Sequence, residues 1–218
     1  MRRYPDMSTV LERFHELGVI PVVVLEDAKD AEALGKALCD GGLPVAEVTF
    51  RTDAAEESIR IMASKFPDML VGAGTVLTVE QARRAVAAGA KFIVSPGFNP
   101  KVVQYCVDND IPVTPGIQTP TEIEMALECG LKVVKFFPAE AAGGLKMIKA
   151  LAGPYVNTYF MPTGGISLEN APEYLKYNKI WAVGGSWIAK KDEIAAGRFE
   201  DIKVKAEEAA ALVKMIRG

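Results

Sequence analysis

A regular alternation of short apolar runs with Ala-rich amphipathic stretches constrains the fold of this 218-residue chain more than any other feature. Eight runs rich in β-branched residues have the character of strands, and the stretches between them repeat apolar residues at helical spacing. The predicted strands are residues 18–25, 45–50, 70–75, 91–97, 111–116, 132–138, 158–165 and 180–185. Their C-terminal ends fall near Leu25, Thr49, Gly74, Pro96, Pro115, Phe137, Thr163 and Gly184, in steps of 19 to 26 residues.

Eight units of similar length predict a (β/α)8 barrel, formed by a single domain of residues 1–218. The segment from Met7 to Gly18 predicts a helix that closes the bottom of the barrel, and residues 193–217 predict closing C-terminal helices. A doubly wound sheet is the alternative. We disfavour it because no strand precedes a Gly-x-Gly-x-x-Gly motif; the nearest string, Gly72 to Leu77, lacks the third glycine.

Composition excludes several classes of function. A formal net charge of −3 argues against a nucleic-acid binder, which would present a basic surface. No apolar run approaches the roughly 18 residues of a membrane span, and we see no signal-peptide pattern. The three cysteines, Cys39, Cys106 and Cys129, have no Cys-x-x-Cys spacing, which is typical of a reduced, cytoplasmic protein.

The single histidine, His15, narrows the chemistry further. A Ser-His-Asp triad or a histidine-rich metal site would have to be built around it, so we expect no metal. Its place beside Phe14 and Leu17 predicts a surface or packing role on a short amphipathic helix. The chemistry is therefore expected to depend on lysine, carboxylates, hydroxyls and backbone groups.

Lys135 is the most informative residue, because it lies within the apolar string Lys-Val-Val-Lys-Phe-Phe-Pro. Burial disfavours the ammonium form of a lysine and leaves a neutral amine, which can form an imine with a ketone. The alternative is a lysine that extends from the strand end into solvent.

Glu47 is the second polar residue in an apolar strand, between two valines. A carboxylate there is costly unless it is paired or functional. By strand parity it shares a face with Val45, Thr49 and Arg51. The strands of Glu47 and Lys135 are both even-numbered, and alternate strands of a barrel share side-chain layers. The two side chains are therefore expected to meet, as an acid/base partner of an imine-forming lysine or as a structural ion pair.

Arg51 and Thr75 follow the second and third strands. A guanidinium with a hydroxyl suits a carboxylate ligand, although each residue alone is also consistent with a surface charge or a capping hydroxyl. Thr78 is expected to be the N-cap of the next helix.

Two glycine pairs follow the last two strands: Gly164-Gly165, and Gly184-Gly185 with Ser186. Barrel enzymes commonly bind phosphate in these two loops through bare backbone N–H groups. A tight turn is the alternative for either pair. No P-loop string is present, so a nucleotide is not implied.

With these residues in place, the chain resembles the 2-keto-3-deoxy-6-phosphogluconate (KDPG) aldolase family, whose bifunctional members also cleave 4-hydroxy-2-oxoglutarate (KHG). The matching strings are GGLPVAEVTFRT, VGAGTVLT, SPGFNP, VTPGIQTPTE, KFFPAE, PTGGIS and VGGSW, in the family's order, from about Val19 to Gly197. The departures are Asn99-Pro100 and the leader of residues 1–7, and neither touches a site position.

The resemblance implies roles for individual residues. Lys135 matches the Schiff-base lysine and Glu47 the acid/base glutamate. Substrate-binding positions are matched by Arg51 and Thr75 for the pyruvyl carboxylate, Pro96 and Phe137 for the pyruvyl pocket, and Gly164, Gly165, Gly184, Gly185 and Ser186 for the phosphate. The resemblance also implies a small-molecule keto-acid substrate, no cofactor beyond the covalent imine, and a homotrimer.

These residues predict a class I, metal-independent aldolase. Three alternatives stay open: an aldolase for the galactonate-derived C4 epimer, a phosphosugar epimerase or decarboxylase barrel that forms no imine, and a catalytically silent barrel that serves assembly or binding.

Overall fold

The computed structural model describes residues 7–218. Residues 1–6, which the single-domain prediction and the noted leader include, lie outside the described residues. The strands are β1 (Val19–Val23), β2 (Val45–Thr49), β3 (Leu70–Gly74), β4 (Ile93–Val94), β5 (Val113–Thr114), β6 (Gly116–Ile117), β7 (Val133–Phe136), β8 (Tyr159–Pro162) and β9 (Val183–Gly185).

The helices alternate with these strands along the chain. They are α1 (Met7–Leu17), α2 (Ala31–Asp40), α3 (Ala55–Lys65), α4 (Val79–Ala87), α5 (Pro100–Asp108), α6 (Pro120–Glu128), α7 (Gly144–Ala152), α8 (Ala171–Leu175), α9 (Lys191–Ala195) and α10 (Phe199–Arg217), with a short 3-10 helix at Ala28–Asp30. The predicted helices at the two ends of the chain are thus present, the C-terminal one as α9 and α10. Thr78 caps α4, as predicted, because its side chain accepts the Gln81 N–H at 3.1 Å.

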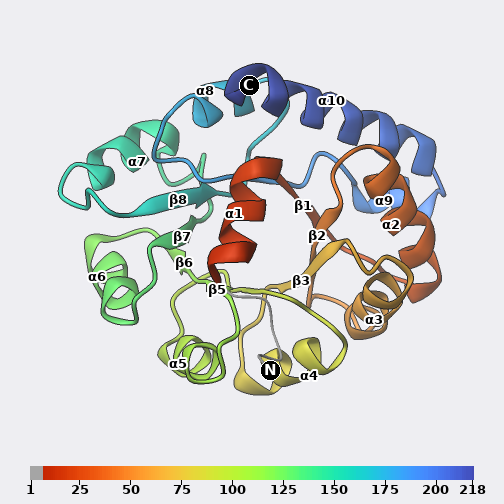
Figure 1. The fold of residues 1–218 in the computed structure, drawn as a ribbon, viewed down its shortest axis with the longest axis horizontal. Coiled ribbons are helices and arrows are strands. Elements are labelled where there is room, and N and C mark those ends of the chain that lie inside the picture. Colours follow the sequence, from red (N-terminus) through yellow and green to blue (C-terminus); the bar gives the residue numbers. More distant parts are fainter. Residues whose placement is uncertain (1–6) are drawn as a thin grey trace.

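The strands form parallel sheets that curl within a ring of helices (Figure 1). One sheet has the order β5-β4-β3-β2-β1-β9, and the other has the order β6-β7-β8. Isolated bridges join Phe160 to Ile180 and Thr163 to Gly184, next to β8 and β9. The alternation of strand and helix and the parallel pairing confirm an α/β fold.

The predicted fifth strand, residues 111–116, is the main difference from the sequence prediction. It is divided at Pro115: β5 pairs with β4, whereas β6 pairs with β7. Proline has no N–H to donate to a ladder. Its carbonyl accepts the Lys135 N–H at 2.9 Å and so links the two halves. The predicted fourth strand, residues 91–97, is shortened to two residues for a related reason, since Pro96 cannot continue it.

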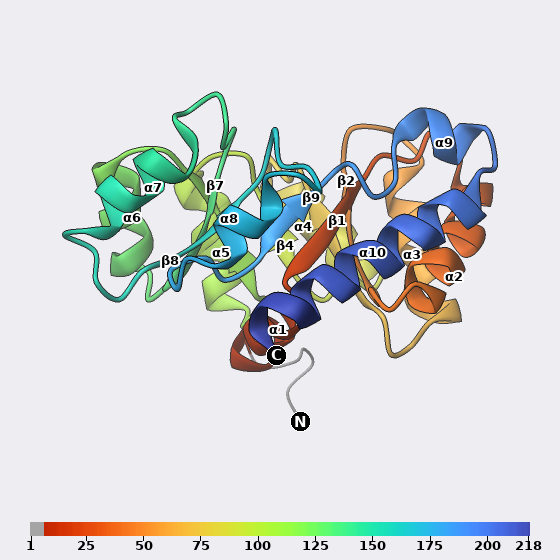
Figure 2. The same ribbon diagram turned by 90° about the horizontal axis from the view of Figure 1, so that it is seen from above.

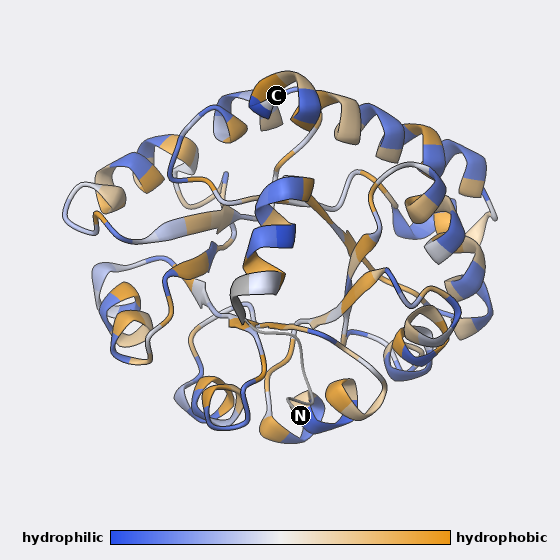
Figure 3. Ribbon diagram, in the orientation of Figure 1, coloured by the Kyte–Doolittle hydropathy of each residue, from blue (hydrophilic) through white to orange (hydrophobic). Residues whose placement is uncertain are grey.

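The apolar side chains divide into two clusters on the two faces of the strands. The larger one lies between the strands and the surrounding helices. The smaller one joins residues of β1, β2, β3, β4, β7 and β8 to Val10 and Phe14 of α1. Figure 3 shows that hydrophilic and hydrophobic residues alternate along the surrounding helices. Figure 2 shows α1 at one end of the strands. The site residues lie at the opposite, C-terminal ends.

Candidate active site

Lys135 and Glu47 form a buried ion pair, as the strand-parity argument predicted. The Nζ of Lys135 lies 3.1 Å from the Oε1 of Glu47, and the two side chains are 6% and 3% exposed. Lys135 belongs to β7, where it pairs with Gly116 and Met161. Glu47 belongs to β2, where it pairs with Val22 and Gly72. Two residues 88 positions apart in sequence therefore meet in the space enclosed by the curled sheet.

The space for the Glu47 carboxylate is created by a glycine on the neighbouring strand. A Cβ atom at Gly74 would lie 2.2 Å from the Glu47 Oε1 and 2.6 Å from its Cγ, so any other residue would displace the carboxylate. No sequence pattern indicates a role for Gly74. Its position at the predicted end of the third strand was visible, but its contact with Glu47 depends on the register of β2 and β3.

This buried ion pair is expected to contribute little to the stability of the fold. Removing two charges from water costs several kcal/mol per ion, and apolar residues of similar volume often stabilise a core equally well. A buried pair beside a strand C-terminus is instead typical of a reactive site, where one group can move a proton to or from the other.

An aromatic ring lies beside the amine, and a proline lies against the strand that pairs with it. The Nζ of Lys135 lies 5.2 Å from the ring centroid of the half-buried Phe137. The Phe137 carbonyl accepts a hydrogen bond from the Gln118 side chain at 2.8 Å, a contact that the sequence analysis missed. Pro96 follows β4, and its carbonyl oxygen would be 2.1 Å from a Cβ at Gly116, the strand partner of Lys135. Phe137, two residues after Lys135 on the same segment, thus lies beside the amine, and Pro96 lies against the neighbouring strand β6.

Arg51 and Thr75 also meet. The Arg51 Nε donates to the Thr75 Oγ1 at 3.1 Å, just beyond the C-terminal ends of β2 and β3. Thr75 has a φ of +55°, a left-handed conformation that is uncommon for a β-branched residue and is found at strained functional positions. The bond orients the guanidinium, whose two terminal nitrogens match the two oxygens of a carboxylate.

The two glycine pairs lie side by side because the Thr163–Gly184 bridge aligns the ends of β8 and β9. A Cβ at Gly184 would lie 2.2 Å from the Thr163 Oγ1, so glycine permits this close approach. Gly164 and Gly165 have φ angles of +97° and +79°. Ser186 follows Gly185 and is exposed. The bridge thus places the two loops that carry the glycine pairs next to each other.

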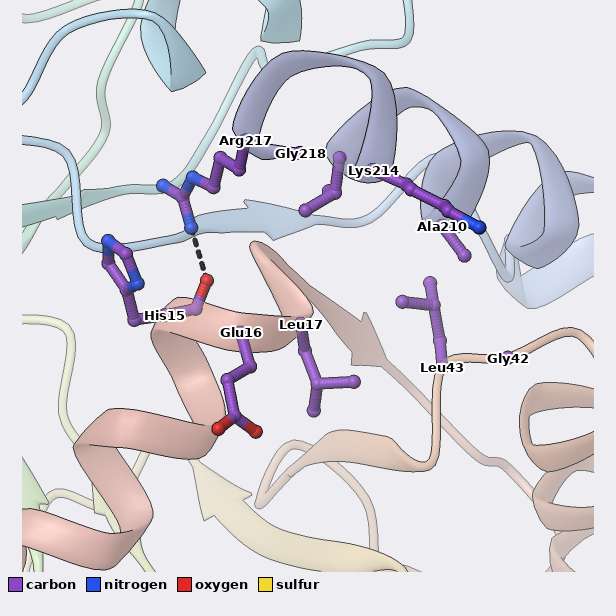
Figure 4. Close-up of a pocket in the computed structure, with 10 residues that line it drawn as sticks. His15, Glu16, Leu17, Gly42, Leu43, Ala210, Lys214, Arg217 and Gly218 are labelled. Carbon is purple, nitrogen blue, oxygen red and sulfur yellow. Dashed lines mark hydrogen bonds between the residues drawn. The ribbon is translucent and has the colours of Figure 1, made fainter.

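His15 lies away from these residues, in agreement with its predicted surface or packing role. Its ring packs on Trp181, with the centroids 4.6 Å apart. Burial lowers the pKa of His15, and the positive charge of Arg217 lowers it further. It borders a cavity of about 410 Å³ between α1 and α10, where its carbonyl accepts a hydrogen bond from Arg217 (Figure 4). This cavity is at the N-terminal end of β1, because Leu17, which lines it, lies two residues before the start of that strand.

Among residues 7–218, no three His, Cys, Asp or Glu side chains gather closely enough to hold a metal ion. None of the helices there has the length and apolar character that crossing a bilayer requires.

The fold and the chemistry at the strand ends define a carbon–carbon lyase of the aldolase class. The chain belongs to the KDPG and KHG aldolase family, whose profile matches residues 10–204. The 2-dehydro-3-deoxy-phosphogluconate aldolase of Treponema pallidum is 50% identical over 207 residues, which are 95% of this chain and 99% of the relative.

Solved structures of KDPG aldolases are also similar to this chain in fold and sequence. The KDPG aldolase of Zymomonas mobilis ZM4 with 3-phosphoglycerate is 40% identical and has a TM-score of 0.85, with 95% of this chain and 96% of that chain covered. The KDPG aldolase of Legionella pneumophila, with pyruvate captured as a covalent carbinolamine, is also 40% identical and has a TM-score of 0.87, with 90% and 96% covered. Membership of this family favours the aldolase interpretation over a non-imine phosphosugar barrel or a silent barrel.

Proposed function

We propose that the protein is a class I aldolase that cleaves KDPG to pyruvate and glyceraldehyde 3-phosphate, and KHG to pyruvate and glyoxylate. The single observation that carries this proposal is the buried pair of Lys135 and Glu47, with 3.1 Å between the amine and the carboxylate. The covalent carbinolamine with pyruvate in the Legionella relative supports the same chemistry.

The reaction begins when the neutral amine of Lys135 attacks the C2 ketone. Glu47 accepts the proton that the ammonium must first lose and returns it to the carbinolamine hydroxyl, which leaves as water to give a protonated imine and a free carboxylate. That cation is the electron sink for the next step. Glu47, directly or through a water molecule, removes the C4 hydroxyl proton, the C3–C4 bond breaks, and the aldehyde leaves. The enamine is protonated at C3, and hydrolysis of the imine releases pyruvate and the free lysine.

The remaining predicted residues bind the two ends of the substrate in this proposal. The Arg51 guanidinium and the Thr75 hydroxyl hold the pyruvyl carboxylate, and their mutual bond of 3.1 Å supports a joint role. Phe137 and Pro96 line the pyruvyl pocket.

The phosphate end would bind to Gly164, Gly165, Gly184, Gly185 and Ser186. The bound 3-phosphoglycerate in the Zymomonas relative is consistent with an anion of this kind. No metal or further cofactor takes part, because the imine itself supplies the electrophile.

We infer that the two sheets close into one (β/α)8 barrel, supported by the Phe160–Ile180 and Thr163–Gly184 bridges. The packing of Val10 and Phe14 against the inner strand faces supports closure of one end by α1. We further infer a single domain of residues 1–218, a homotrimer, as the family resemblance implies, and a cytoplasmic setting, in keeping with three unpaired cysteines.

Borohydride trapping tests the nucleophile. Reduction in the presence of pyruvate should fix the three-carbon unit on Lys135 alone, which peptide mass spectrometry identifies. Lys135→Arg should abolish labelling, because a guanidinium is not deprotonated in practice and cannot form the imine. Lys132→Arg, at an exposed position on the same segment, is the matched control and should label normally. Labelling of another lysine would overturn the assignment.

Product analysis with both C4 epimers tests the substrate. The gluconate-derived sugar acid phosphate should be cleaved faster than the galactonate-derived one. The reverse order would assign the protein to the epimeric substrate.

A further inference from the structure

The loop after β8 that carries the first glycine pair is braced by the segment after β7. The Ala139 N–H donates to the Thr163 carbonyl at 2.8 Å, and the Glu140 N–H donates to the Gly164 carbonyl at 3.1 Å. The side chain of Glu140 also packs against this loop, since a Cβ at Gly165 would lie 2.6 Å from both the Cβ and the Cγ of Glu140. The side chain that carries the Glu140 carboxylate therefore lies directly beside the glycines that, in the proposed function, bind the phosphate of the substrate.

This carboxylate is held by a tyrosine from another helix. The hydroxyl of Tyr174, in α8, donates to the Glu140 Oε1. Tyr174 is only 2% exposed, so its ring is held within the core. Burial, with the hydrogen bond to Glu140 and the charge of Glu140, raises the pKa of Tyr174, so the phenol remains a donor over the working pH range.

A glycine also leaves the space for the contact between the Tyr174 hydroxyl and the Glu140 carboxylate. Gly144 has a φ of +59°, and a Cβ there would lie 3.0 Å from the Tyr174 hydroxyl and 3.1 Å from the Glu140 Oε1. The Glu140 Oε1 therefore lies beside Gly144, the first residue of α7, and a helix N-terminus favours negative charge. The Oε1 of Glu140 thus has its partner on α8, while the aliphatic part of the side chain faces Gly165.

A carboxylate without these partners would compete with a phosphate for the same backbone donors and would repel it. We propose that Tyr174 is a positioning residue for phosphate recognition: its hydroxyl restrains the Glu140 carboxylate and keeps the backbone donors of Gly164 and Gly165 available to the phosphate end of the substrate. This inference rests on the proposed function, and it predicts a selective effect on phosphorylated ligands.

Tyr174→Phe removes the hydroxyl and keeps the buried ring. It should raise KM for KDPG by about tenfold, the size of one charge-assisted hydrogen bond, with kcat unchanged. Cleavage of KHG, which carries no phosphate, should stay within about twofold, well below one charge-assisted bond. Inhibition of KDPG cleavage by inorganic phosphate should weaken in parallel. Adding Glu140→Gln to Tyr174→Phe should restore phosphate affinity, because the competing charge is removed.

Tyr155→Phe is the matched control. The hydroxyl of Tyr155 also donates to a glutamate, Glu124, at 2.8 Å, but that pair joins α6 to the segment after α7. It should leave both activities unchanged.

Three outcomes would overturn the inference. Equal losses on KDPG and KHG would mean that Tyr174 acts through the fold. A normal KM for KDPG in Tyr174→Phe would mean that Glu140 needs no restraint, and a double variant no better than Tyr174→Phe would exclude competition by charge. Failure of the proposed function is distinguishable, because it would show in the wild-type protein as a lack of cleavage of both keto acids.

Discussion

Gly74 leaves the space that the carboxylate of Glu47 occupies. A methyl group on Gly74 would approach the Glu47 Oε1 to 2.2 Å, far inside van der Waals contact. The backbone of Gly74 does not have a positive φ, so alanine fits its conformation. The role of this glycine is therefore steric.

Gly74→Ala should displace Glu47 and lower kcat by about 10²-fold or more, the lower end for loss of a general acid/base. The fold should persist, as measured by circular dichroism. Gly153→Ala is the control, because its Cβ would meet the nearest neighbouring atom at an ordinary 3.4 Å. Wild-type kcat in Gly74→Ala would show that the carboxylate position is not critical.

Glu47→Gln tests the proton transfer itself. We expect kcat to fall by about 10²–10⁴-fold, because the amide is isosteric but cannot accept the proton. Exchange of the pyruvate methyl protons with deuterated water, followed by NMR, should slow as well, since it reports enamine formation without any aldehyde. Glu193→Gln is the control, because Glu193 is another buried carboxylate with a lysine partner, Lys205. Unchanged exchange in Glu47→Gln would assign the proton to another group.

The contact between Glu47 and Lys135 was predictable because it depends on simple geometry. Side chains alternate along a strand, and alternate strands of a barrel share layers. Arg51 and Thr75 follow consecutive strands, and they were grouped because a guanidinium with a hydroxyl suits a carboxylate ligand.

Other features depend on tertiary register and were not predictable from local pattern. The division of the fifth strand at Pro115 follows from the pairing of Gly116 with Lys135 and from its close approach to Pro96. Glu140 was visible within the KFFPAE string, but its partner Tyr174 lies 34 positions later on a five-residue helix. No sequence spacing indicates that contact.

Removal of metal ions tests the nature of the electron sink. In the proposed mechanism the protonated imine on Lys135 provides the electrophile that a class II aldolase obtains from zinc. Activity should therefore survive exhaustive treatment with EDTA or dipicolinate. Loss of activity that added zinc restores would contradict the class I mechanism.

The three thiols should differ in reactivity. Cys106 is fully buried, and burial raises the pKa of its thiol to about 12, so at pH 8 only about one molecule in ten thousand carries the thiolate. Cys39 and Cys129 are half-buried. A disulfide reagent should titrate two thiols in the native protein and a third only after unfolding in 6 M guanidinium chloride. Most domains unfold below about 5 M of this denaturant. Fast modification of Cys106 in the native state would contradict its burial.

Ser186→Leu tests the phosphate end of the substrate. Ser186 is exposed and follows the second glycine pair, which the Thr163–Gly184 bridge aligns with Gly164. Leucine removes a donor and adds bulk where the anion would bind. A charge-assisted hydrogen bond contributes about 1.5–3 kcal/mol, so kcat/KM for KDPG should fall by at least about tenfold.

KHG ends before it reaches this loop, so its cleavage by Ser186→Leu should stay within about a factor of three, less than the value of one such hydrogen bond. Inorganic phosphate should compete with KDPG and only weakly with KHG, for the same reason. The two substrates thus serve as internal controls in one protein sample. If Ser186→Leu lowers both activities equally, the loop acts through the fold or the lysine pocket, and the phosphate assignment is wrong.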